Sequence, residues 1–342
     1  MRVAFLGVGH WHTPFYLDPC RALLGVTIAG VTDPDPAKTA RVAARAACPG
    51  FPDEAALLAT ARPDFVFVLG RHCDMAASVR RVIAARVPFA VEKPAGLGAA
   101  EVAGLARDAG TLFAAVPLVF RDSALHRAIA GPVQLASFRF IGGPVSRYLA
   151  EDCGWMLRQA EAGGGALLNL GIHFLDLCLA LCPTARVIGA TRARFTPGCE
   201  VEEYANVLLE AGAARLAVET GYLFPAPHSV FDLRYSLRDA GHYYSVGTPD
   251  ALEITDLAGN RQTVPMPTIN ATMYPGFVAD VLARAAAGRA PVVGLADLAR
   301  ALALVEAAYA LAPIAPSARR GVTTRRHRPR ALDIGTGGSE RW

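Results

Sequence analysis

The chain contains 342 residues, of which 53% are hydrophobic and 19% are charged. This composition excludes a disordered or fibrous protein, and the length favours two globular domains with a core each. The formal net charge is +4, but the segment 319–342 holds seven arginines against Asp333 and Glu340, a net of +5. The rest of the chain then has 27 basic and 28 acidic residues, a net of −1, which excludes a basic face for nucleic acid. We expect the Arg-rich segment, which has almost no apolar residues, to be a disordered tail.

The seven cysteines include no Cys-x-x-Cys pair, and their number is odd. This pattern indicates reduced, mostly buried thiols in a cytoplasmic protein, and neither a disulfide framework nor a zinc site. No run of about 18 apolar residues lacks a polar interruption, and the first apolar run is short and ends in Gly-x-Gly. The sequence therefore predicts no membrane span, no signal peptide and no bound metal.

A dinucleotide-binding motif in partial form follows the first predicted strand, residues 3–6. The motif is Gly7-Val-Gly9-His10-Trp11-His12. Its two glycines allow a tight turn and a close approach of backbone to a pyrophosphate at a helix N-terminus. His12 stands where the fingerprint has a third small residue, so it either lies near cofactor phosphates or substrate, or simply packs. Two histidines spaced two apart do not share a helical face, so no metal site is predicted here.

Asp33 follows the second predicted strand, residues 26–31, where a ribose-binding acid belongs in this fold. It could instead be a turn residue. However, Asp35 and Pro36 already provide an N-cap and a first helical residue for the next helix, which leaves Asp33 for the ribose. Because no arginine follows Asp33 to bind a 2′-phosphate, we expect NAD in preference to NADP.

Helical and extended patterns alternate up to residue 119, which predicts a parallel, doubly wound sheet. Asp18 and Pro19 form a second cap-like pair and predict a break in the first helix. After Arg121, polar and apolar residues alternate in short segments that predict antiparallel strands. The predicted helices are 37–47, 53–61, 74–85, 99–109 and 295–311, and the predicted strands after the first two are 64–69, 89–91, 111–119, 134–140, 203–209, 215–219 and 230–237.

One predicted strand ends abruptly in Glu92-Lys93-Pro94. The carboxyl ends of parallel strands gather ligand-binding groups, so this pair is expected to face a crevice. Only Lys38 and Lys93 among the 34 basic residues are lysines, which favours a role that needs an amine able to lose its proton. A surface ion pair at a strand end is the equally plausible alternative from these residues alone.

A second informative stretch begins with three glycines, Gly163 to Gly165, and continues as a predicted helix. Asn169, His173 and Asp176 follow at spacings of four and three, which places them on one helical face. Three polar groups on an otherwise apolar helix need partners when buried. A lone histidine there would most often be a core residue, but the three together favour a site.

These motifs together resemble those of the Gfo/Idh/MocA oxidoreductases, which include glucose-fructose oxidoreductase and inositol 2-dehydrogenase. The resemblance covers nearly everything up to about residue 322 and lies in Gly7-x-Gly9, Asp33, Glu92-Lys93-Pro94, Phe120-Arg121 and Gly-Gly-Gly-Ala-Leu-Leu-Asn169-x-Gly-x-His173-x-x-Asp176. It implies an α/β fold with a Rossmann domain in residues 1–120. It also implies an α/β domain in 121–318 with a large, mostly antiparallel open sheet, through which a homodimer or homotetramer would form.

The resemblance also implies hydride transfer between NAD(P) and a hydroxyl- or carbonyl-bearing carbon of a sugar, sugar derivative or cyclitol. Lys93 and His173 would be the acid–base pair, and Asp176 would orient substrate or His173. Asn169 stands where many relatives have Asp; it can bind a substrate hydroxyl but cannot take its proton. The remaining expected contacts are Arg121 and Trp155 with the substrate, and Gly7, Gly9, His10, Trp11, His12, Asp33, Glu92 and Lys93 with the cofactor.

Two other functions fit the same fold. One is a regulator that binds NAD(P) without turnover, which the presence of both Lys93 and His173 disfavours. The other is an enzyme that oxidises a glycoside transiently and then eliminates the aglycone, whose first step needs the same residues. The loop Leu69 to Met75 departs from the pattern of the relatives, so cofactor contacts there are not predicted.

Overall fold

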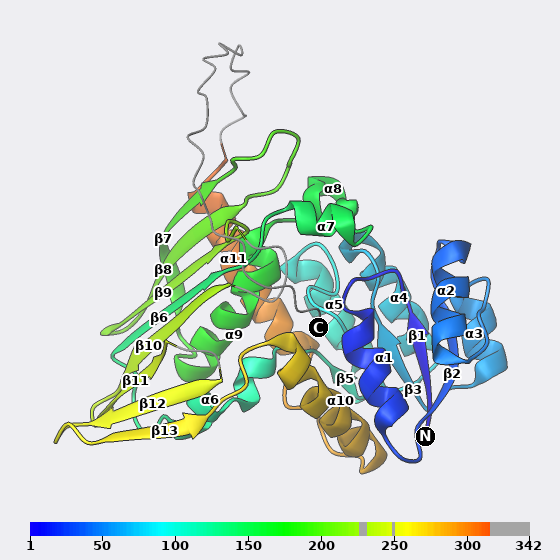
Figure 1. Ribbon diagram of the computed structural model, residues 1–342, viewed down its shortest axis with the longest axis horizontal. Helices are drawn as coiled ribbons and strands as arrows, with labels where there is room; N and C mark the ends of the chain where they lie inside the picture. The colour runs from blue at the N-terminus through cyan, green and yellow to red at the C-terminus, as the bar shows by residue number, and fades with distance from the viewer. Residues whose placement is uncertain (226–230, 248–249, 315–342) are drawn as a thin grey trace, which may run out of the picture.

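The computed structural model describes residues 1–225, 231–247 and 250–314. The Arg-rich segment 319–342 lies outside these residues, so its predicted disorder stays a prediction. Two sheets with their helices lie side by side in the molecule (Figure 1).

The first sheet has five parallel strands in the order β2-β1-β3-β4-β5. β3 and β4 are buried along their whole length, which explains their continuous apolar sequence. The order confirms the predicted doubly wound Rossmann sheet. Its strands are β1 (Arg2–Leu6), β2 (Thr27–Thr32), β3 (Phe65–Val68), β4 (Phe89–Val91) and β5 (Ala114–Ala115), and its helices are α1 (Thr13–Ala22), α2 (Pro36–Ala46), α3 (Glu54–Ala61), α4 (His72–Ala84) and α5 (Ala99–Ala109).

The predicted break in the first helix was wrong, because α1 continues through Pro19. A proline removes its own N–H donor, yet helical bonding resumes with Leu23 N donating to the Pro19 carbonyl at 3.2 Å. The predicted strand 111–119 is also much shorter than expected. After Ala115 the backbone leaves the sheet, and Val116 N donates to the Val293 carbonyl at 3.1 Å.

The second sheet has eight strands in the order β13-β12-β11-β10-β6-β9-β8-β7. Only β6 and β9 pair in parallel; the other neighbours are antiparallel. The fold class, including a large and mostly antiparallel sheet, is therefore confirmed. The strands are β6 (Leu135–Ile141), β7 (Arg186–Ala193), β8 (Tyr204–Ala211), β9 (Ala214–Gly221), β10 (Asp232–Arg238), β11 (His242–Val246), β12 (Ala251–Asp256) and β13 (Arg261–Pro265).

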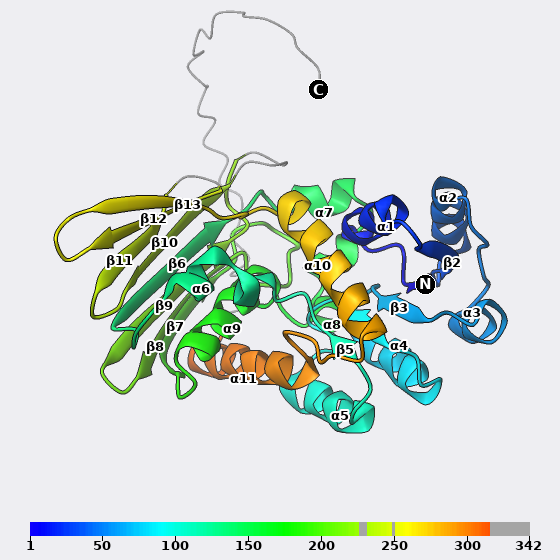
Figure 2. The ribbon, with the colours of Figure 1, turned by 90° about the horizontal axis from the view of Figure 1, so that it is seen from below.

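Helices α9 (Ile172–Leu181) and α11 (Leu295–Leu311) cover one face of the second sheet (Figures 1 and 2). No helix of the described residues covers the opposite face. The short elements between the sheets are η1 (Val119–Asp122), α6 (Ala124–Ala128), α7 (Ser146–Ala150), η2 (Gly154–Leu157), α8 (Gln159–Ala162) and the π-helical turn η3 (Leu167–Gly171).

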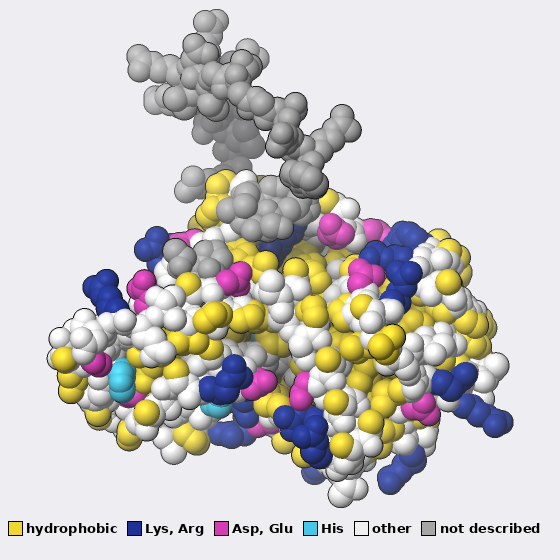
Figure 3. Space-filling model, turned by 60° about the horizontal axis from the view of Figure 1, so that its bottom comes forward, with side chains coloured by type: hydrophobic (Ala, Val, Ile, Leu, Met, Phe, Trp, Pro, Cys, Tyr) yellow, Lys and Arg dark blue, Asp and Glu magenta, His cyan; other side chains and the backbone are white. Residues whose placement is uncertain are grey.

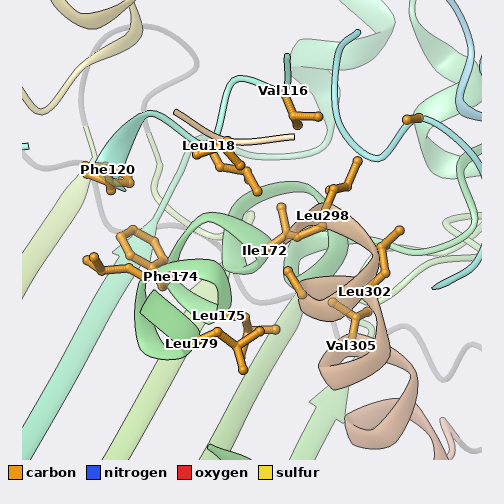
Figure 4. Close-up of a cluster of buried hydrophobic side chains, with 14 of the residues drawn as sticks. Val116, Leu118, Phe120, Ile172, Phe174, Leu175, Leu179, Leu298, Leu302 and Val305 are labelled. Atoms are coloured by element: carbon orange, nitrogen blue, oxygen red, sulfur yellow. The ribbon is translucent and has the colours of Figure 1, made fainter. Parts of the chain in front are cut away.

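The apolar core is continuous between the two sheets. Phe120 of η1, Ile172 and Phe174 of α9 and Leu298 of α11 point toward one another in its central part (Figure 4). The same cluster extends to Val91 of β4. Burying each such side chain contributes about 1.5–3 kcal/mol relative to exposure, so this shared core holds the two sheets in a defined arrangement.

Residues Gln159–Leu181 form a helical stretch whose length and apolarity would permit a membrane span. However, 78% of its most apolar window is buried inside the protein, between the second sheet and α11. It therefore has the position of a core helix.

Helix α10 (Asn270–Ala286) follows the second sheet in sequence but packs against α1 of the Rossmann sheet. Tyr274 and Phe277 of α10 both contact the ring of Tyr16 in α1. The chain thus returns to the first sheet after completing the second, and residues from both ends of the sequence meet at the Rossmann surface.

We expect Gly165→Ala to lower the free energy of unfolding by about 2–3 kcal/mol, because overpacking of this size forces the backbone to shift. A Cβ at Gly165 would lie 1.9 Å from the carbonyl oxygen of Glu202. Denaturant unfolding measures the change. Gly276→Ala is the control: its Cβ meets nothing within 4 Å in α10, so stability should stay level or rise. Equal stability of both variants would contradict the packing argument.

Candidate active site

A buried carboxylate, Glu92, lies directly after β4 and joins three elements. Its Oε1 accepts hydrogen bonds from His12 Nδ1 at 2.6 Å, from the Tyr16 hydroxyl at 2.7 Å and from the Tyr274 hydroxyl at 3.0 Å. Its Oε2 accepts from the backbone N–H of Lys93 at 3.0 Å. These bonds connect β4 with the start of α1 and with α10.

The charge of Glu92 is maintained by these donors. Burial alone would raise its pKa, but His12 and Lys93 hold the pKa of the carboxyl well below its usual range. Burial lowers the pKa of His12 despite the opposing effect of Glu92, so His12 is neutral at pH 7. A neutral ring donates from Nδ1 to Glu92 and leaves Nε2 to accept from Asn270 Nδ2, which lies 3.3 Å away. His12 is thus held by its partners rather than free at the glycine turn.

The amine of Lys93 is buried and points toward the second domain. Its Nζ donates to the Asn169 carbonyl at 2.9 Å and also to the Asn169 side-chain oxygen. Burial, aided by the nearby Arg147, lowers the pKa of Lys93 to about 8 against the opposing effect of Glu92. An ammonium has three donors, so one remains for a further oxygen.

The π-helical turn η3 carries Asn169, and α9, which follows it, carries His173. The buried carboxylate of Glu202 accepts from the backbone N–H groups of Gly165 and Leu167, both at 3.0 Å, and so satisfies donors at the start of this helical stretch. The Asn169 amide donates from Nδ2 to the Tyr148 hydroxyl at 2.7 Å, which fixes its oxygen toward Lys93.

His173 has no hydrogen-bond partner within the described part of the chain, and its Nδ1 is buried. Burial, with a contribution from the charge of Lys93, lowers its pKa to about 3, so the imidazole is neutral at pH 7. Its ring lies nearly perpendicular to that of Phe120, with the ring centroids 6.2 Å apart.

Lys93, Asn169 and His173 line one cavity of about 250 Å³ between the two domains. Trp11, His12 and Arg147 lie on its wall as well. The structure therefore brings together residues separated by some 160 positions in the chain. The apolar part of the wall includes Phe15, Phe120, Phe140, Phe174, Leu233 and Tyr235.

Asp176 and Arg121 lie outside this cavity lining and bind each other. Arg121 donates from Nε and Nη2 to the two carboxylate oxygens of Asp176, at 2.9 and 2.7 Å, and from Nη1 to Asp297 at 3.0 Å. Burial raises the pKa of Asp176 to about 6 even though Arg121 opposes it. No hydrogen bond joins Asp176 to His173 in the described residues; the hydrogen-bond donor to both oxygens of Asp176 is Arg121. Asn169 and His173 both line the cavity, whereas Asp176, three residues after His173 in α9, is bound by Arg121 of η1, so only two of the three residues of the predicted polar face meet the cavity.

A second cavity, of about 320 Å³, lies at the carboxyl ends of β1 and β2 and is lined by Gly7, Gly9, His10, Asp33 and Trp155. Lys38 of α2 lines it as well. Trp155, expected at the substrate, instead lies here, with its ring 5.9 Å from that of His10. His10 is buried, and burial lowers its pKa well below the usual value.

These residues fit a dinucleotide. Gly7 has a φ of +70°, and a Cβ there would lie 2.6 Å from the Cα of Gly70, so only glycine permits this close approach of two loops. Asp33 Oδ2 accepts from the N–H of Gly9 at 2.6 Å, which holds the carboxylate at the end of β2.

Five residues at or beside these cavities were not assigned by sequence reasoning: Lys38, Arg147, Tyr148, Glu202 and Asn270. Lys38 had a signal, as one of only two lysines in the chain. Its Nζ lies 2.8 Å from Asp152 Oδ2 and so bridges α2 to the second domain. The other four belong to no local pattern, because they reach the site through tertiary contacts. Among the described residues, no group of three or more His, Cys, Asp or Glu is placed to hold a metal.

The comparison with protein families agrees with this geometry. Residues 1–113 match an oxidoreductase family with an NAD-binding Rossmann fold, and residues 130–238 match the GFO/IDH/MocA C-terminal domain. The chain therefore belongs to the Gfo/Idh/MocA family of NAD-binding oxidoreductases, as its motifs predicted.

One curated relative, from Amycolatopsis mediterranei, is provisionally named the oxidoreductase subunit of a UDP-kanosamine synthase. It is 31% identical over 210 residues, and the match spans 57% of this chain and 56% of the relative. Two solved structures share the fold. Levoglucosan dehydrogenase matches with a TM-score of 0.77 at 14% identity, over 91% of this chain and 97% of its own. UDP-N-acetylglucosamine 3-dehydrogenase from Acidithiobacillus ferrooxidans matches with a TM-score of 0.73 at 22% identity, over 91% of this chain and 98% of its own.

The two lysines should titrate far apart. Protein labelled with ¹³C at lysine Cε should give one resonance that titrates near pH 8, from Lys93, and one that titrates above the ordinary lysine pKa, from Lys38. Glu92→Gln should lower the Lys93 midpoint further, because the carboxylate favours the ammonium. The resonance that disappears in Lys93→Met belongs to Lys93, and the one that remains belongs to Lys38. Two resonances that titrate together above pH 10 would rule out a depressed pKa at Lys93.

Proposed function

We propose that this chain is an NAD-dependent oxidoreductase that transfers a hydride to or from a hydroxyl- or carbonyl-bearing carbon of a sugar, sugar derivative or cyclitol. The observation that supports this best is the meeting of Lys93, Asn169 and His173 on one cavity wall. Trp11 and His12 line the same cavity, while the preceding His10 lines the dinucleotide pocket, so the two spaces adjoin.

The bound nicotinamide would accept or supply the hydride. Lys93 would hold the substrate oxygen with the donor that Asn169 leaves free. A pKa of about 8 lets this amine exist in both protonation states near neutrality, so it can take the hydroxyl proton in oxidation and return it in reduction. Neutral His173 would hold the same oxygen through a ring nitrogen. Asn169 would orient the amine, because its side chain spans Lys93 and Tyr148.

We further propose that Asp176 supports the site indirectly. Its ion pair with Arg121 fixes η1 against α9, and Arg121 also binds Asp297 of α11.

A homo-oligomer through the uncovered face of the second sheet is proposed as well. Leu135, Leu208 and Tyr243 are large exposed side chains on β6, β8 and β11 of that sheet.

NAD should bind more tightly than NADP. The Asp33 carboxylate would accept hydrogen bonds from an adenosine ribose and repel a 2′-phosphate. Titration of both reduced cofactors by fluorescence gives the two dissociation constants. Because Lys38 lines the same pocket, Lys38→Met is the informative variant. Tighter binding of NADP by the wild type, lost in Lys38→Met, would show that the lysine outweighs Asp33.

Lys93→Met should lower turnover by about 10²-fold or more, the usual contribution of a general acid–base group. NAD affinity should change little, since Lys93 lies in the substrate cavity. Lys93→Arg should fail almost as badly, because a guanidinium does not give up its proton. The wild-type rate of oxidation should rise as the pH passes about 8, and that of reduction should fall.

A panel of sugars, sugar acids and cyclitols, followed by cofactor absorbance, measures these rates. His173→Ala should be similarly damaging, and the double variant should lose less than the sum if the two residues act together. A wild-type rate from Lys93→Met would refute the assignment. No turnover on any substrate, with NAD still bound, would favour the non-catalytic regulator.

A further inference from the structure

Arg147 of α7 is a cation on the wall of the substrate cavity, surrounded by aromatic rings. Its guanidinium carbon lies 4.7 Å from the ring centroid of Tyr148, 5.2 Å from that of Tyr222 and 6.0 Å from that of Trp11. Its one hydrogen bond within the described residues runs from Nη2 to the Tyr148 hydroxyl, at 2.7 Å. Contacts with ring faces stabilise the cation but do not use its N–H groups.

No carboxylate of the described residues pairs with Arg147. The groups that favour its charge are the Tyr148 and Tyr222 phenols, which raise its pKa against the effect of burial. Its Nε is buried without a hydrogen-bond partner. A largely buried charge without a counter-ion is costly, and the other arginine beside the site, Arg121, binds two carboxylates.

Several buried polar atoms without partners belong to residues that line this cavity. Trp11 Nε1 and His173 Nδ1 are buried polar atoms without partners, as is Arg147 Nε, and all three residues line it. The charge of Arg147 lowers the pKa of both Lys93 and His12, so its field reaches the proposed catalytic amine. Two cations therefore face one cavity whose lining, among the described residues, contains no carboxylate. Glu92, which precedes Lys93, does not line the cavity and already accepts from four donors.

The cofactor does not account for Arg147. Its phosphates would lie at the start of α1 beside Gly7 and Gly9, and Arg147 does not line that pocket. A guanidinium presents a planar set of donors that matches a carboxylate or a phosphate. Neither the described residues nor the cofactor pocket therefore supplies a counter-ion for Arg147.

We propose that Arg147 is a specificity-determining residue that binds a carboxylate or phosphate carried by the sugar-like substrate. This inference rests on the proposed function, because it takes the cavity of Lys93 and His173 as the substrate site. It narrows the substrate class from sugars in general to acidic sugars, sugar phosphates or nucleotide-linked sugars.

The test is calorimetric titration of the NAD-saturated protein with four probes: D-glucose, D-glucuronate, glucose 1-phosphate and UDP-glucose. Arg147→Gln removes the charge, Arg147→Lys keeps it without the planar fork, and Arg80→Gln is the control. Arg80 is an exposed arginine of α4 that lies 3.5 Å from Glu101 and lines neither cavity. NADH affinity of each variant verifies that the fold and the cofactor pocket are intact.

At least one anionic probe should bind the wild type more tightly than glucose. Its affinity should fall by about 10²-fold in Arg147→Gln, less in Arg147→Lys, and stay unchanged in Arg80→Gln. Which probe responds identifies the anion as a carboxylate, a phosphate monoester or a pyrophosphate. Glucose should bind the wild type and Arg147→Gln equally.

Three results would overturn the proposal. They are a wild type that prefers no anionic probe over glucose, an Arg147→Gln variant that retains full affinity for the preferred anion, and a loss of NADH affinity in that variant while the control keeps it. Binding of a probe does not require that the protein turn it over, and NADH absorbance recorded in parallel shows whether hydride transfer occurs. A charge-dependent affinity with no hydride transfer would therefore support the anion site while the proposed function fails.

Discussion

The hydrogen bonding of Glu92 is the constraint on which the rest of the site depends. A carboxylate without solvent contact is expensive, and it stays charged here because His12, Tyr16, Tyr274 and the backbone of Lys93 all donate to it. Those donors come from the end of β4, the start of α1 and the first turns of α10. One charge therefore determines how the glycine turn, the lysine and a helix from the far end of the chain are placed.

The same charge sets the chemistry of its neighbour. Burial and Arg147 disfavour the ammonium of Lys93, whereas Glu92 favours it, and the balance leaves a pKa of about 8. For the nearby His12 and His173, burial outweighs the effect of Glu92 and lowers the pKa, so both rings are neutral. The cavity thus holds one titratable amine and one permanent cation among neutral groups. In the function proposed above, this division would separate proton transfer by Lys93 from recognition of an anion by Arg147.

The packing around the cavity explains how these groups keep their positions. The core passes without interruption from Val91 in the first sheet to Phe138 in the second, and Glu202 binds the start of the helical stretch that carries Asn169 and His173. Charged residues on the outer surface are dispersed instead, with Lys and Arg scattered among Asp, Glu and apolar side chains on the face in Figure 3. The charged groups that act most closely on one another, Glu92, Lys93 and Arg147, lie instead around the buried cavity.

The local sequence determined the elements and the family. Apolar runs, caps such as Asp35-Pro36 and the spacing of glycines specify strands, helix starts and the cofactor turn through contacts between near neighbours, and Lys93 and His173 stood out for the same reason. Tertiary structure decided what depends on distant partners. Arg121 binds Asp176 outside the cavity that Asn169 and His173 line, the β5 backbone left its sheet to bond Val293, and Pro19 stayed inside α1. Arg147, Tyr148, Glu202 and Asn270 had no local signal, because their roles follow from which charges and donors the fold leaves satisfied or unpaired.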